Sequence, residues 1–392
     1  MKIGLFTDTY LPNINGVVTS VEMTRKKLEE LGHDVYVVCS HPGLLHIKTE
    51  GNIISLPGFE LKKLYGYSLA HPIHPIIMDK IRGLHLDLIH CHTEFGVGMF
   101  GVQIAKLFHI PMVKTYHTTY EDYTHYLNPF DFERLDHGLK FAINKISKFS
   151  GNDCTRLISP SEKTKELLLS YGITTPIDVI PTGIEIKRFM NKYPDEDILK
   201  QAHLQMRNDD KFVFLYVGRI AQEKSLDMLI NAFKLVKNDN LKAKLCIIGK
   251  GPQEEEIIET IKNNNLEEHV VFLGSKENIH IPAYYQNADA FISASTTETQ
   301  GLTYIEALST GLIVLGRYDE VVQDIIIENE NGFLFDDENE LYKKIKHILS
   351  LSDKQIKTMK ENATNSSKQY DADIFVQEIL KTYKKAIEDY NK

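Results

Sequence analysis

The segment KFVFLYVGRIAQEKSLDML, residues 211–229, decides the fold class of this 392-residue chain. It opens with a continuous run of apolar and aromatic residues and passes through a glycine into a stretch with helical patterning. Continuous apolar strands that alternate with amphipathic helices are typical of parallel sheets covered by helices on both faces. The segment therefore predicts one strand-loop-helix unit of an α/β domain.

The same pattern extends in both directions along the chain. It predicts two series of strands, at 2–6, 34–38, 52–56, 86–90, 111–116, 156–160 and 177–181, and then at 211–218, 244–249, 269–274, 288–294, 312–316 and 332–336. Two series imply two doubly wound, Rossmann-like domains, whose expected bounds are 1–190 and 211–372. A charged stretch at 191–210 is expected to be the linker, and 373–392 a helix that packs back on the first domain.

Composition and charge narrow the class of protein. With 42% hydrophobic and 25% charged residues, the chain has the composition of an ordinary soluble globular protein. Its net charge of −9 argues against general nucleic-acid binding. Residues 1–190 hold 20 basic and 20 acidic side chains, so all the excess acidity lies in the second half. Twelve of the 16 histidines precede residue 190, which indicates that the halves present different surfaces.

Cysteine spacing and the amino terminus bear on the compartment. The four cysteines have neither metal-finger nor redox spacing, so we expect free thiols in a reducing compartment: Cys39, Cys91, Cys154 and Cys246. On a strand, only His90 and His92 of the His-Cys-His run share a face, and no further ligand set accompanies them, so no metal site is expected. The start lacks a signal-peptide pattern, and no apolar run reaches the ~18 residues of a membrane span. A cytoplasmic protein with at most peripheral membrane contact is expected.

In a doubly wound domain, ligands bind outside the carboxyl ends of the strands. After the first strand, Pro12 to Gly16 form a tight turn before a helix whose amino-terminal amides face an anion, or Gly16 is only a turn glycine. The loop lacks the G-x-G-x-x-G fingerprint, which argues against a nicotinamide enzyme. His117 follows the strand 111–116. It either donates a hydrogen bond to a substrate oxygen or has no catalytic role, since this half of the chain contains eleven other histidines.

Two loops of the second half carry groups suited to a nucleotide. Arg219 and Lys224 follow the strand 211–218, where a forked guanidinium and a point charge suit a diphosphate, although solvated surface cations are the alternative. Gly249 and Gly251 flank Lys250 and either let a base approach the backbone or form a turn.

A third loop of this half carries an acidic pair. Glu298 and Glu306 flank Gly301 with seven residues between them, and a carboxylate that accepts two hydroxyls is how a protein holds a ribose or hexose. As an isolated acidic pair, the two residues are unremarkable.

In this order and at these distances, the E-x7-E pair, the G-R-x4-K signal, the Pro-to-Gly loop and the histidine resemble the retaining glycosyltransferases of family 4. That resemblance implies a GT-B fold, with two Rossmann-like domains facing across a cleft. It further implies that Arg219 and Lys224 neutralise the donor diphosphate, Glu306 binds the ribose and Glu298 the transferred sugar. His117 would lie by the sugar, no metal would be needed, and amides would cap phosphate oxygens around Gly16 and at Gly301, Leu302 and Thr303.

Three segments are similar to bacterial diacylglycerol α-glucosyltransferases, at 15–20 (NGVVTS), 117–123 (HTTYEDY) and 297–308 (TETQGLTYIEAL). The similarity implies a UDP-glucose donor, a diacylglycerol acceptor and a role in glycolipid synthesis at the inner face of the cell membrane. The alternatives are another acceptor (a glycosylated lipid, polysaccharide or phosphatidylinositol), a non-catalytic GT-B partner subunit, or a sugar-nucleotide epimerase.

Two segments are candidates for contact with an anionic membrane. Residues 131–150 place apolar side chains at helical spacing with lysines toward one end, and 59–82 are rich in aromatic and basic residues. The alternative for 131–150 is a helix packed on the core with solvated lysines.

Overall fold

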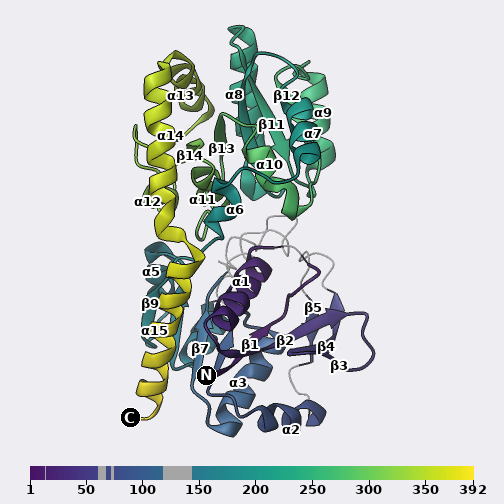
Figure 1. Cartoon of the computed structure of the whole chain (residues 1–392), viewed down its shortest axis with the longest axis vertical. Helices are drawn as coiled ribbons and strands as arrows, with labels where there is room; N and C mark the ends of the chain where they lie inside the picture. The colour runs from purple at the N-terminus through teal and green to yellow at the C-terminus, as the bar shows by residue number, and fades with distance from the viewer. Residues whose placement is uncertain (14, 61–67, 72–74, 118–143) are drawn as a thin grey trace. The chain divides into compact units, whose positions relative to one another are not determined.

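The computed structural model describes residues 1–13, 15–60, 68–71, 75–117 and 144–392 (Figure 1). Its contacts divide the chain into two compact units, which we call unit 1 (Met1–Gly183 with Ala372–Lys392) and unit 2 (Ile184–Asp371). Each unit is built around a predominantly parallel sheet, so the α/β class and the two doubly wound domains expected from the sequence are confirmed.

Unit 1 contains a nine-stranded sheet within the described part of the chain. In spatial order its main path is β3 (Lys48–Glu50), β4 (Ile53–Glu60), β2 (Asp34–Pro42), β1 (Lys2–Thr7), β6 (Leu88–Cys91), β7 (Met112–Thr115), β8 (Arg156–Ser159) and β9 (Ile177–Val179). Outside this path, β5 (Ser68–Ala70) pairs with β4. The sequence patterns miss only β3 and β5, which are short and pair with β4 in antiparallel fashion.

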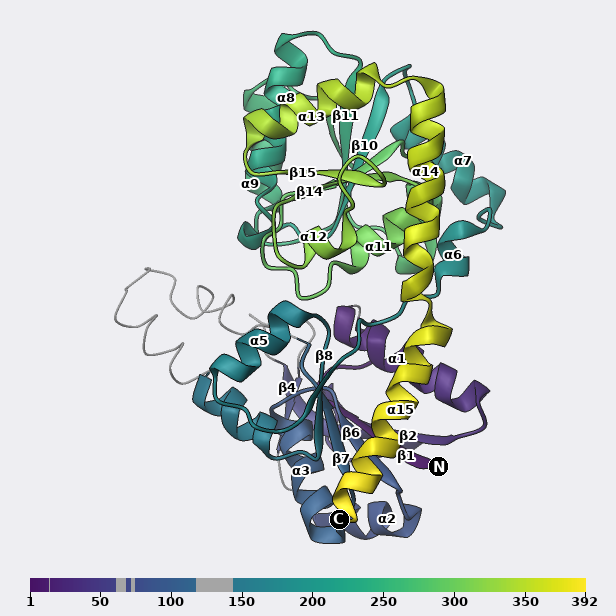
Figure 2. The same cartoon turned by 90° about the vertical axis from the view of Figure 1, so that its left-hand side faces the viewer.

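Helices cover both faces of this sheet. The described helices are α1 (Gly16–Glu30), α2 (Pro75–Leu84), α3 (Gly96–Phe108), residues 144–152, α5 (Glu162–Ser170) and α15 (Ala372–Tyr390). On one face α15 runs beside α1, and the two bury apolar side chains against β1, β2 and β6 (Figure 2). On the other face α2 and α3 pack around Phe6 and Phe100.

Unit 2 contains a six-stranded parallel sheet. In spatial order its strands are β12 (Val270–Phe272), β11 (Ala243–Ile248), β10 (Phe212–Val217), β13 (Ala290–Ser293), β14 (Ile313–Arg317) and β15 (Gly332–Phe335). Its α-helices are α6 (Ile186–Met190), α7 (Glu196–Met206), α8 (Leu226–Asn238), α9 (Glu254–Asn263), α10 (Ile281–Tyr285), α11 (Leu302–Ser309), α12 (Val322–Ile325), α13 (Glu338–Ser350) and α14 (Asp353–Ser367).

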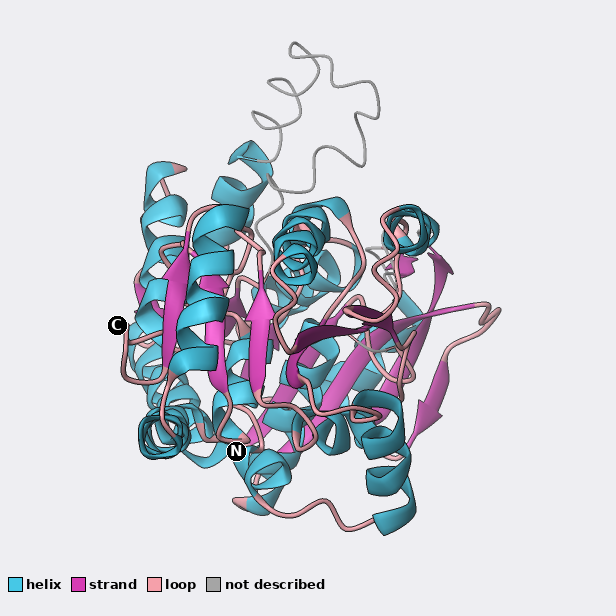
Figure 3. Ribbon diagram, turned by 90° about the horizontal axis from the view of Figure 1, so that it is seen from above, coloured by secondary structure: helices cyan, strands magenta, loops and turns pink. Residues whose placement is uncertain are grey.

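Two buried clusters lie on opposite faces of the unit 2 sheet. One gathers side chains from α8, α9 and α13, and the other gathers side chains from α6, α7, α10, α11 and α12. Strands enclosed between layers of helices are visible when the molecule is viewed from above (Figure 3). Because both faces are buried, the strands read as the continuous apolar runs from which they were predicted.

The expected domain bounds need correction. Unit 2 begins at Ile184, so the first unit ends before residue 190, and residues 191–210 are not a linker. Within them α7 buries Ala202 and Met206 completely in the unit 2 core. The helix expected to start near Pro194 is therefore not part of a linker but an amphipathic helix of unit 2, whose apolar side packs in the core. The terminal segment, from Ala372, belongs to unit 1.

The described helices also bear on membrane contact. None of the helices in the described part of the chain combines the length and the apolar character needed to cross a bilayer. Of the two candidate membrane segments, most of 131–150 and part of 59–82 lie outside the described residues.

Candidate active site

The carboxyl end of β1 carries a buried acid that the sequence patterns did not single out. Asp8 accepts hydrogen bonds from the Val97 amide (2.7 Å) and from the Thr93 hydroxyl (2.7 Å). Burial raises the pKa of Asp8 to about 6, although these hydrogen bonds oppose the shift. The lack of a side chain at Gly96 leaves room for the Asp8 carboxylate, since a Cβ there would lie 2.8 Å from an Asp8 oxygen. Asp8 thereby fixes the start of α3 against the end of β1.

The start of α1 follows the same strand. Asn15 caps the helix by accepting the Val18 amide (2.9 Å), while its own amide nitrogen donates to the Thr9 hydroxyl (3.1 Å). Gly16 is the first residue of the helix, where backbone amides have no partner inside the helix. The structure therefore places Gly16 at a helix amino terminus, as its predicted role in phosphate binding requires.

A row of aromatic side chains crosses unit 1 from α15 to His117. We call Tyr383, His90, His92 and His117 the histidine row. His90 is fully buried, and its nitrogens lie 2.8 Å from the Tyr383 hydroxyl and 2.7 Å from the Thr115 hydroxyl. The His90 and His92 ring centroids are 4.0 Å apart. His92 Nδ1 lies 3.0 Å from His117 Nε2. The sequence identified His117 but gave no reason to link it to the other three.

Desolvation keeps these imidazoles neutral. Burial lowers the pKa of His90 to about 3 and that of His117 to about 4, and it lowers the pKa of His92 well below its usual value. At neutral pH each imidazole of the row is therefore uncharged, with one N–H donor and one nitrogen acceptor.

In unit 2, two of the predicted site residues form a direct ion pair. Lys224 ends the short 3-10 helix Gln222–Lys224, and its Nζ lies 2.7 Å from Glu298 Oε1 and 3.2 Å from Ser295 Oγ. Both side chains are more than four-fifths buried. The structure thus brings together the β10 loop and the β13 loop, which are more than 70 residues apart in sequence.

Arg219 follows β10 directly. Its Nη1 lies 3.7 Å from the carboxylate of Glu223, and its carbonyl accepts the hydroxyl of the fully buried Tyr216 at 2.8 Å. The hydrogen bond from Tyr216 holds the loop backbone against the strand. A residue of the buried core therefore holds the loop that carries Arg219 and Lys224 in place.

Gly249 and Gly251 lie where close backbone contacts leave no room for a side chain. A Cβ on Gly249 would lie 1.8 Å from the Gly218 carbonyl oxygen, and one on Gly251 would lie 2.1 Å from the carbonyl oxygen of Ile220. The loops after β10 and β11 thus pack backbone against backbone. This packing explains both glycines without a nucleotide, and their contact with a base stays a prediction.

The β13 loop leads into α11, which carries the second acid. Gly301 has φ of 71°, a left-handed conformation that favours glycine, directly before the first helical residues Leu302 and Thr303. Glu306 lies one turn further on and accepts a hydrogen bond from the buried Tyr285 hydroxyl (3.0 Å). Desolvation of its carboxyl group raises the pKa of Glu306 to about 7, although the Tyr285 hydrogen bond lowers it.

Unit 2 combines the cations of Arg219 and Lys224 with the carboxylates of Glu298 and Glu306 near the amino terminus of α11. Groups of this kind suit a phosphorylated sugar. Residues 14–188 match the family model "Glycosyltransferase Family 4", and residues 200–366 match "Glycosyl transferases group 1". The α-monoglucosyldiacylglycerol synthase of Acholeplasma laidlawii is 36% identical over 397 residues, covering 100% of this chain and 99% of the relative. The chain belongs to the glycosyltransferase family of this synthase.

Two further comparisons agree with this assignment. The α-monoglucosyldiacylglycerol synthase of Streptococcus pneumoniae is 33% identical over 87% of this glycosyltransferase and 76% of the relative. The crystal structure of Anabaena HepE in complex with UDP-glucose has a TM-score of 0.73, with 18% identity, 98% of this chain covered and 100% of that one. The resemblance read from the sequence is confirmed, and the glycosyltransferase has the GT-B fold.

Proposed function

We propose that this glycosyltransferase transfers glucose from UDP-glucose to diacylglycerol with retention of the anomeric configuration and without a metal ion. The Lys224–Glu298 pair carries the proposal, because it places a phosphate-binding cation 2.7 Å from a carboxylate suited to sugar hydroxyls. The synthases of A. laidlawii and S. pneumoniae support the acceptor by their names, and HepE with UDP-glucose supports the donor.

The proposed reaction is a front-face displacement. The bond between the anomeric carbon and the β-phosphate oxygen breaks while the acceptor oxygen forms a bond on the same face. The proton of the acceptor hydroxyl moves to the departing phosphate oxygen, so the product pair is UDP and an α-glucoside. Arg219 and Lys224 stabilise the charge that develops on the diphosphate, as preorganised cations do, and they take the place of a divalent metal.

The other site residues position the donor. Glu306 accepts hydrogen bonds from the ribose hydroxyls and Glu298 accepts them from hydroxyls of the glucose. His117 donates to a glucose hydroxyl and so orients the sugar ring for displacement. Backbone amides at Gly16 and at the start of α11, after Gly301, bind phosphate oxygens.

The test is a transfer assay with radiolabelled UDP-glucose and mixed micelles that contain diacylglycerol. We expect a labelled product in the organic phase that α-glucosidase cleaves and β-glucosidase does not, at a rate unaffected by EDTA. Parallel reactions with phosphatidylinositol, a glucosylated lipid or a polysaccharide test the other acceptors. Absence of a lipid-soluble product would exclude lipid acceptors, and a β-linked product would exclude retention.

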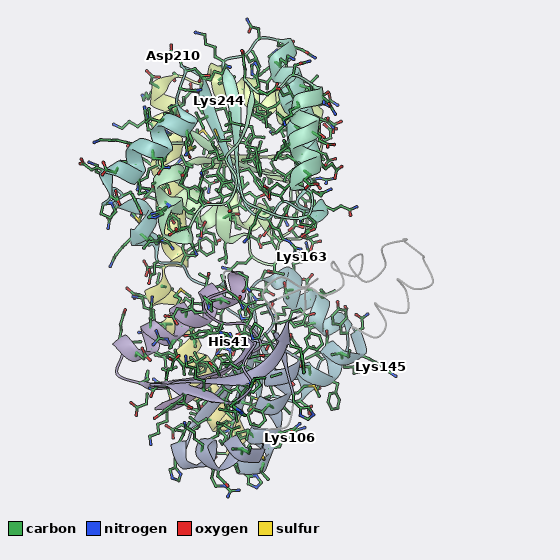
Figure 4. All side chains as sticks on the ribbon, turned by 90° about the vertical axis from the view of Figure 1, so that its right-hand side faces the viewer. His41, Lys106, Lys145, Lys163, Asp210 and Lys244 are labelled. Carbon is green, nitrogen blue, oxygen red and sulfur yellow. The ribbon has the colours of Figure 1, made fainter. Side chains whose placement is uncertain are left out.

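We also propose peripheral contact with an anionic membrane at the cytoplasmic face. On the helix at residues 144–152, Ile146 and Phe149 expose 47% and 71% of their surface, while Ser147 and Ser150 are buried. This part of the predicted amphipathic helix therefore presents its apolar side to solvent. Exposed Lys145 and Lys148 lie on the same helix, and Figure 4 shows Lys145 with Lys106 and Lys163 along one flank of unit 1.

Vesicle flotation tests this contact. We expect binding to vesicles of phosphatidylglycerol and phosphatidylcholine, with weaker binding to phosphatidylcholine alone, because apolar area and basic charge both contribute. The double substitution Ile146→Ser and Phe149→Ser should weaken it. The same change at Leu204, which is 74% exposed on α7, is the matched control. Equal flotation of both variants would contradict the assignment of this surface.

A further inference from the structure

His92 has no role in the mechanism proposed above, yet the structure places it in direct contact with His117. Its side chain is buried, with 2% of the residue exposed. Its Nδ1 is 3.0 Å from Nε2 of His117, which is within hydrogen-bond range. When both rings are neutral, a hydrogen bond between these two nitrogens requires one of them to carry the hydrogen and the other to accept it.

The two rings meet edge to edge. Their planes differ by 18°, and their centroids are 5.3 Å apart although the facing nitrogens are only 3.0 Å apart. Rings packed face to face would not combine so long a centroid distance with so short a contact between ring nitrogens. A nearly coplanar, edge-to-edge pair directs the N–H of one ring at the lone pair of the other.

The row holds His92 in this position. Its ring lies against the ring of His90, with centroids 4.0 Å apart. His90 is in turn fixed at both nitrogens, by the hydroxyls of Tyr383 on α15 and of Thr115 on β7. Because His92 packs against this fixed ring, it has little freedom to turn away from His117.

The remaining nitrogen of His92 indicates which ring donates. Within the described residues, His92 Nε2 is a buried atom without a hydrogen-bond partner. If His117 donated, His92 would carry its own hydrogen on Nε2, as a buried N–H with no acceptor. If His92 donates, only a lone pair is left unpaired there, and buried N–H groups without partners are the rarer case.

We propose that His92 is a positioning residue that donates its Nδ1 hydrogen to Nε2 of His117 and so keeps the hydrogen of His117 on Nδ1. This inference rests on the proposed function, in which His117 donates a hydrogen bond to the transferred sugar. An imidazole whose Nε2 accepts from a fixed neighbour is held ready to donate through Nδ1, as a neighbouring hydrogen bond selects a tautomer elsewhere.

Nitrogen-15 NMR of the full-length protein with labelled histidine measures the tautomer directly. The His117→Gln spectrum assigns the His117 signals by their absence. We expect His117 in the wild type to be protonated at Nδ1 and unprotonated at Nε2. In His92→Phe, which keeps a ring at the position but has no donor, we expect a mixture of the two tautomers. A wild-type His117 protonated at Nε2, or a tautomer unchanged in His92→Phe, would overturn the proposal.

Kinetics supply the second readout. An asparagine amide can occupy the position of Nδ1 and a glutamine amide that of Nε2, so His92→Asn should retain most of kcat while His92→Gln and His92→Phe lose about tenfold. KM for UDP-glucose should change less than kcat in all three. His269→Phe is the matched control, because His269 is also buried with a hydrogen bond at Nδ1 but lies in unit 2.

The two readouts separate the possible failures. Equal losses in His92→Asn and His92→Phe would indicate a structural role and overturn the proposal. No transfer by the wild type to any acceptor would contradict the proposed function, and the NMR result would still decide how His92 acts on His117.

Discussion

The two units bring opposite kinds of chemistry to the carboxyl ends of their strands. Unit 1 presents the histidine row, in which burial keeps the imidazoles neutral and each contact is a hydrogen bond or a ring contact. Unit 2 presents the charged pair Lys224–Glu298 with Arg219 on the same loop as Lys224. From this contrast we expect unit 2 to bind a charged group by electrostatics and unit 1 to act through directed, uncharged donors.

Charge distribution sharpens this comparison. The whole net charge of −9 comes from the second half of the chain, while the first half is balanced. Unit 2, residues 184–371, holds 23 basic and 31 acidic side chains, so its net charge is −8 although its site carries two cations. We expect the local charge of the site, and not the overall charge, to decide which ligand binds. The predictions below test each side of the contrast, beginning with the largest expected effect.

Removal of the central cation of unit 2 should have the largest effect. Lys224→Ala deletes the proposed diphosphate ligand and leaves Glu298 without its partner at 2.7 Å. We expect kcat/KM for UDP-glucose to fall about 10³-fold, or ~4 kcal/mol of transition-state stabilisation. Steady-state kinetics with Lys262→Ala as control, an exposed lysine on α9, measure the difference. A loss of less than tenfold would mean that Lys224 serves the fold and not the donor.

Removal of the His117 imidazole, at the end of the histidine row, should have a smaller effect than removal of the Lys224 ammonium group. His117→Ala should lower kcat about 10²-fold and change KM for the donor little, because the proposed hydrogen bond orients the glucose for displacement whereas the proposed diphosphate contacts dominate donor binding. His33→Ala is the control, since His33 is partly buried in the turn between α1 and β2, away from the row. A His117→Ala enzyme with a nearly normal rate would contradict the role given to the row.

The two sites also differ in how far the sequence predicts them. Arg219, Lys224, Glu298 and Glu306 stand in short motifs on loops after apolar strands, so local patterns identify them together with the fold. His92 and His117 are 25 residues apart, and His90 and Tyr383 are 293 apart. Their contacts depend on strand order and on the position at which α15 docks, which no local pattern encodes. Asp8 and Tyr285 were missed because each acts on a backbone or carboxyl group that only the folded chain brings near.

The ionic network of unit 1 is expected to stabilise the fold and not the reaction. Arg156 of β8 forks onto Asp178 at 2.9 and 3.1 Å and reaches Asp389 of α15 at 2.7 Å. Asp178→Asn should lower the free energy of unfolding of unit 1 by about 2 kcal/mol and leave kcat unchanged. Chemical denaturation followed by circular dichroism measures the first and the transfer assay the second. A lowered kcat at full stability would place this network in the catalytic machinery instead.

Low pH should remove the stabilisation that the ion pair of Asp178 with Arg156 contributes. The pKa of Asp178 is lowered by the hydrogen bond from Arg156 and further by Thr382, against the effect of burial. A carboxyl whose folded pKa lies below its unfolded value stabilises the protein above the unfolded pKa, and this stabilisation is lost as pH falls through the folded pKa. The stability difference between wild type and Asp178→Asn should therefore shrink below about pH 4. A difference that is constant down to pH 2 would contradict the ionic explanation.

The smallest expected effect concerns Glu306, an acid of the unit 2 site whose pKa lies near neutrality. With a pKa of about 7, the Glu306 carboxyl group is mostly protonated near pH 6 and mostly ionised near pH 8, and the ionised form is the one proposed to accept hydrogen bonds from two ribose hydroxyls. UDP-glucose does not titrate in this range, so calorimetric affinity should weaken about tenfold from the higher to the lower pH. Glu306→Gln should bind weakly and without that pH dependence.

The Tyr285→Phe variant tests whether Tyr285 acts by changing the ionisation of Glu306 or only by contacting it. The Tyr285 hydroxyl donates to Glu306 and lowers its pKa, and the nearby Arg188 acts in the same direction. Loss of the hydroxyl should therefore move the midpoint of the affinity profile to higher pH while the affinity well above it stays close to that of the wild type. A midpoint that moves down, or an affinity equally weak at every pH, would mean that Tyr285 supports the loop and does not tune the acid. No imidazole of the histidine row is expected to titrate between pH 6 and 8, so such a profile does not arise from that row.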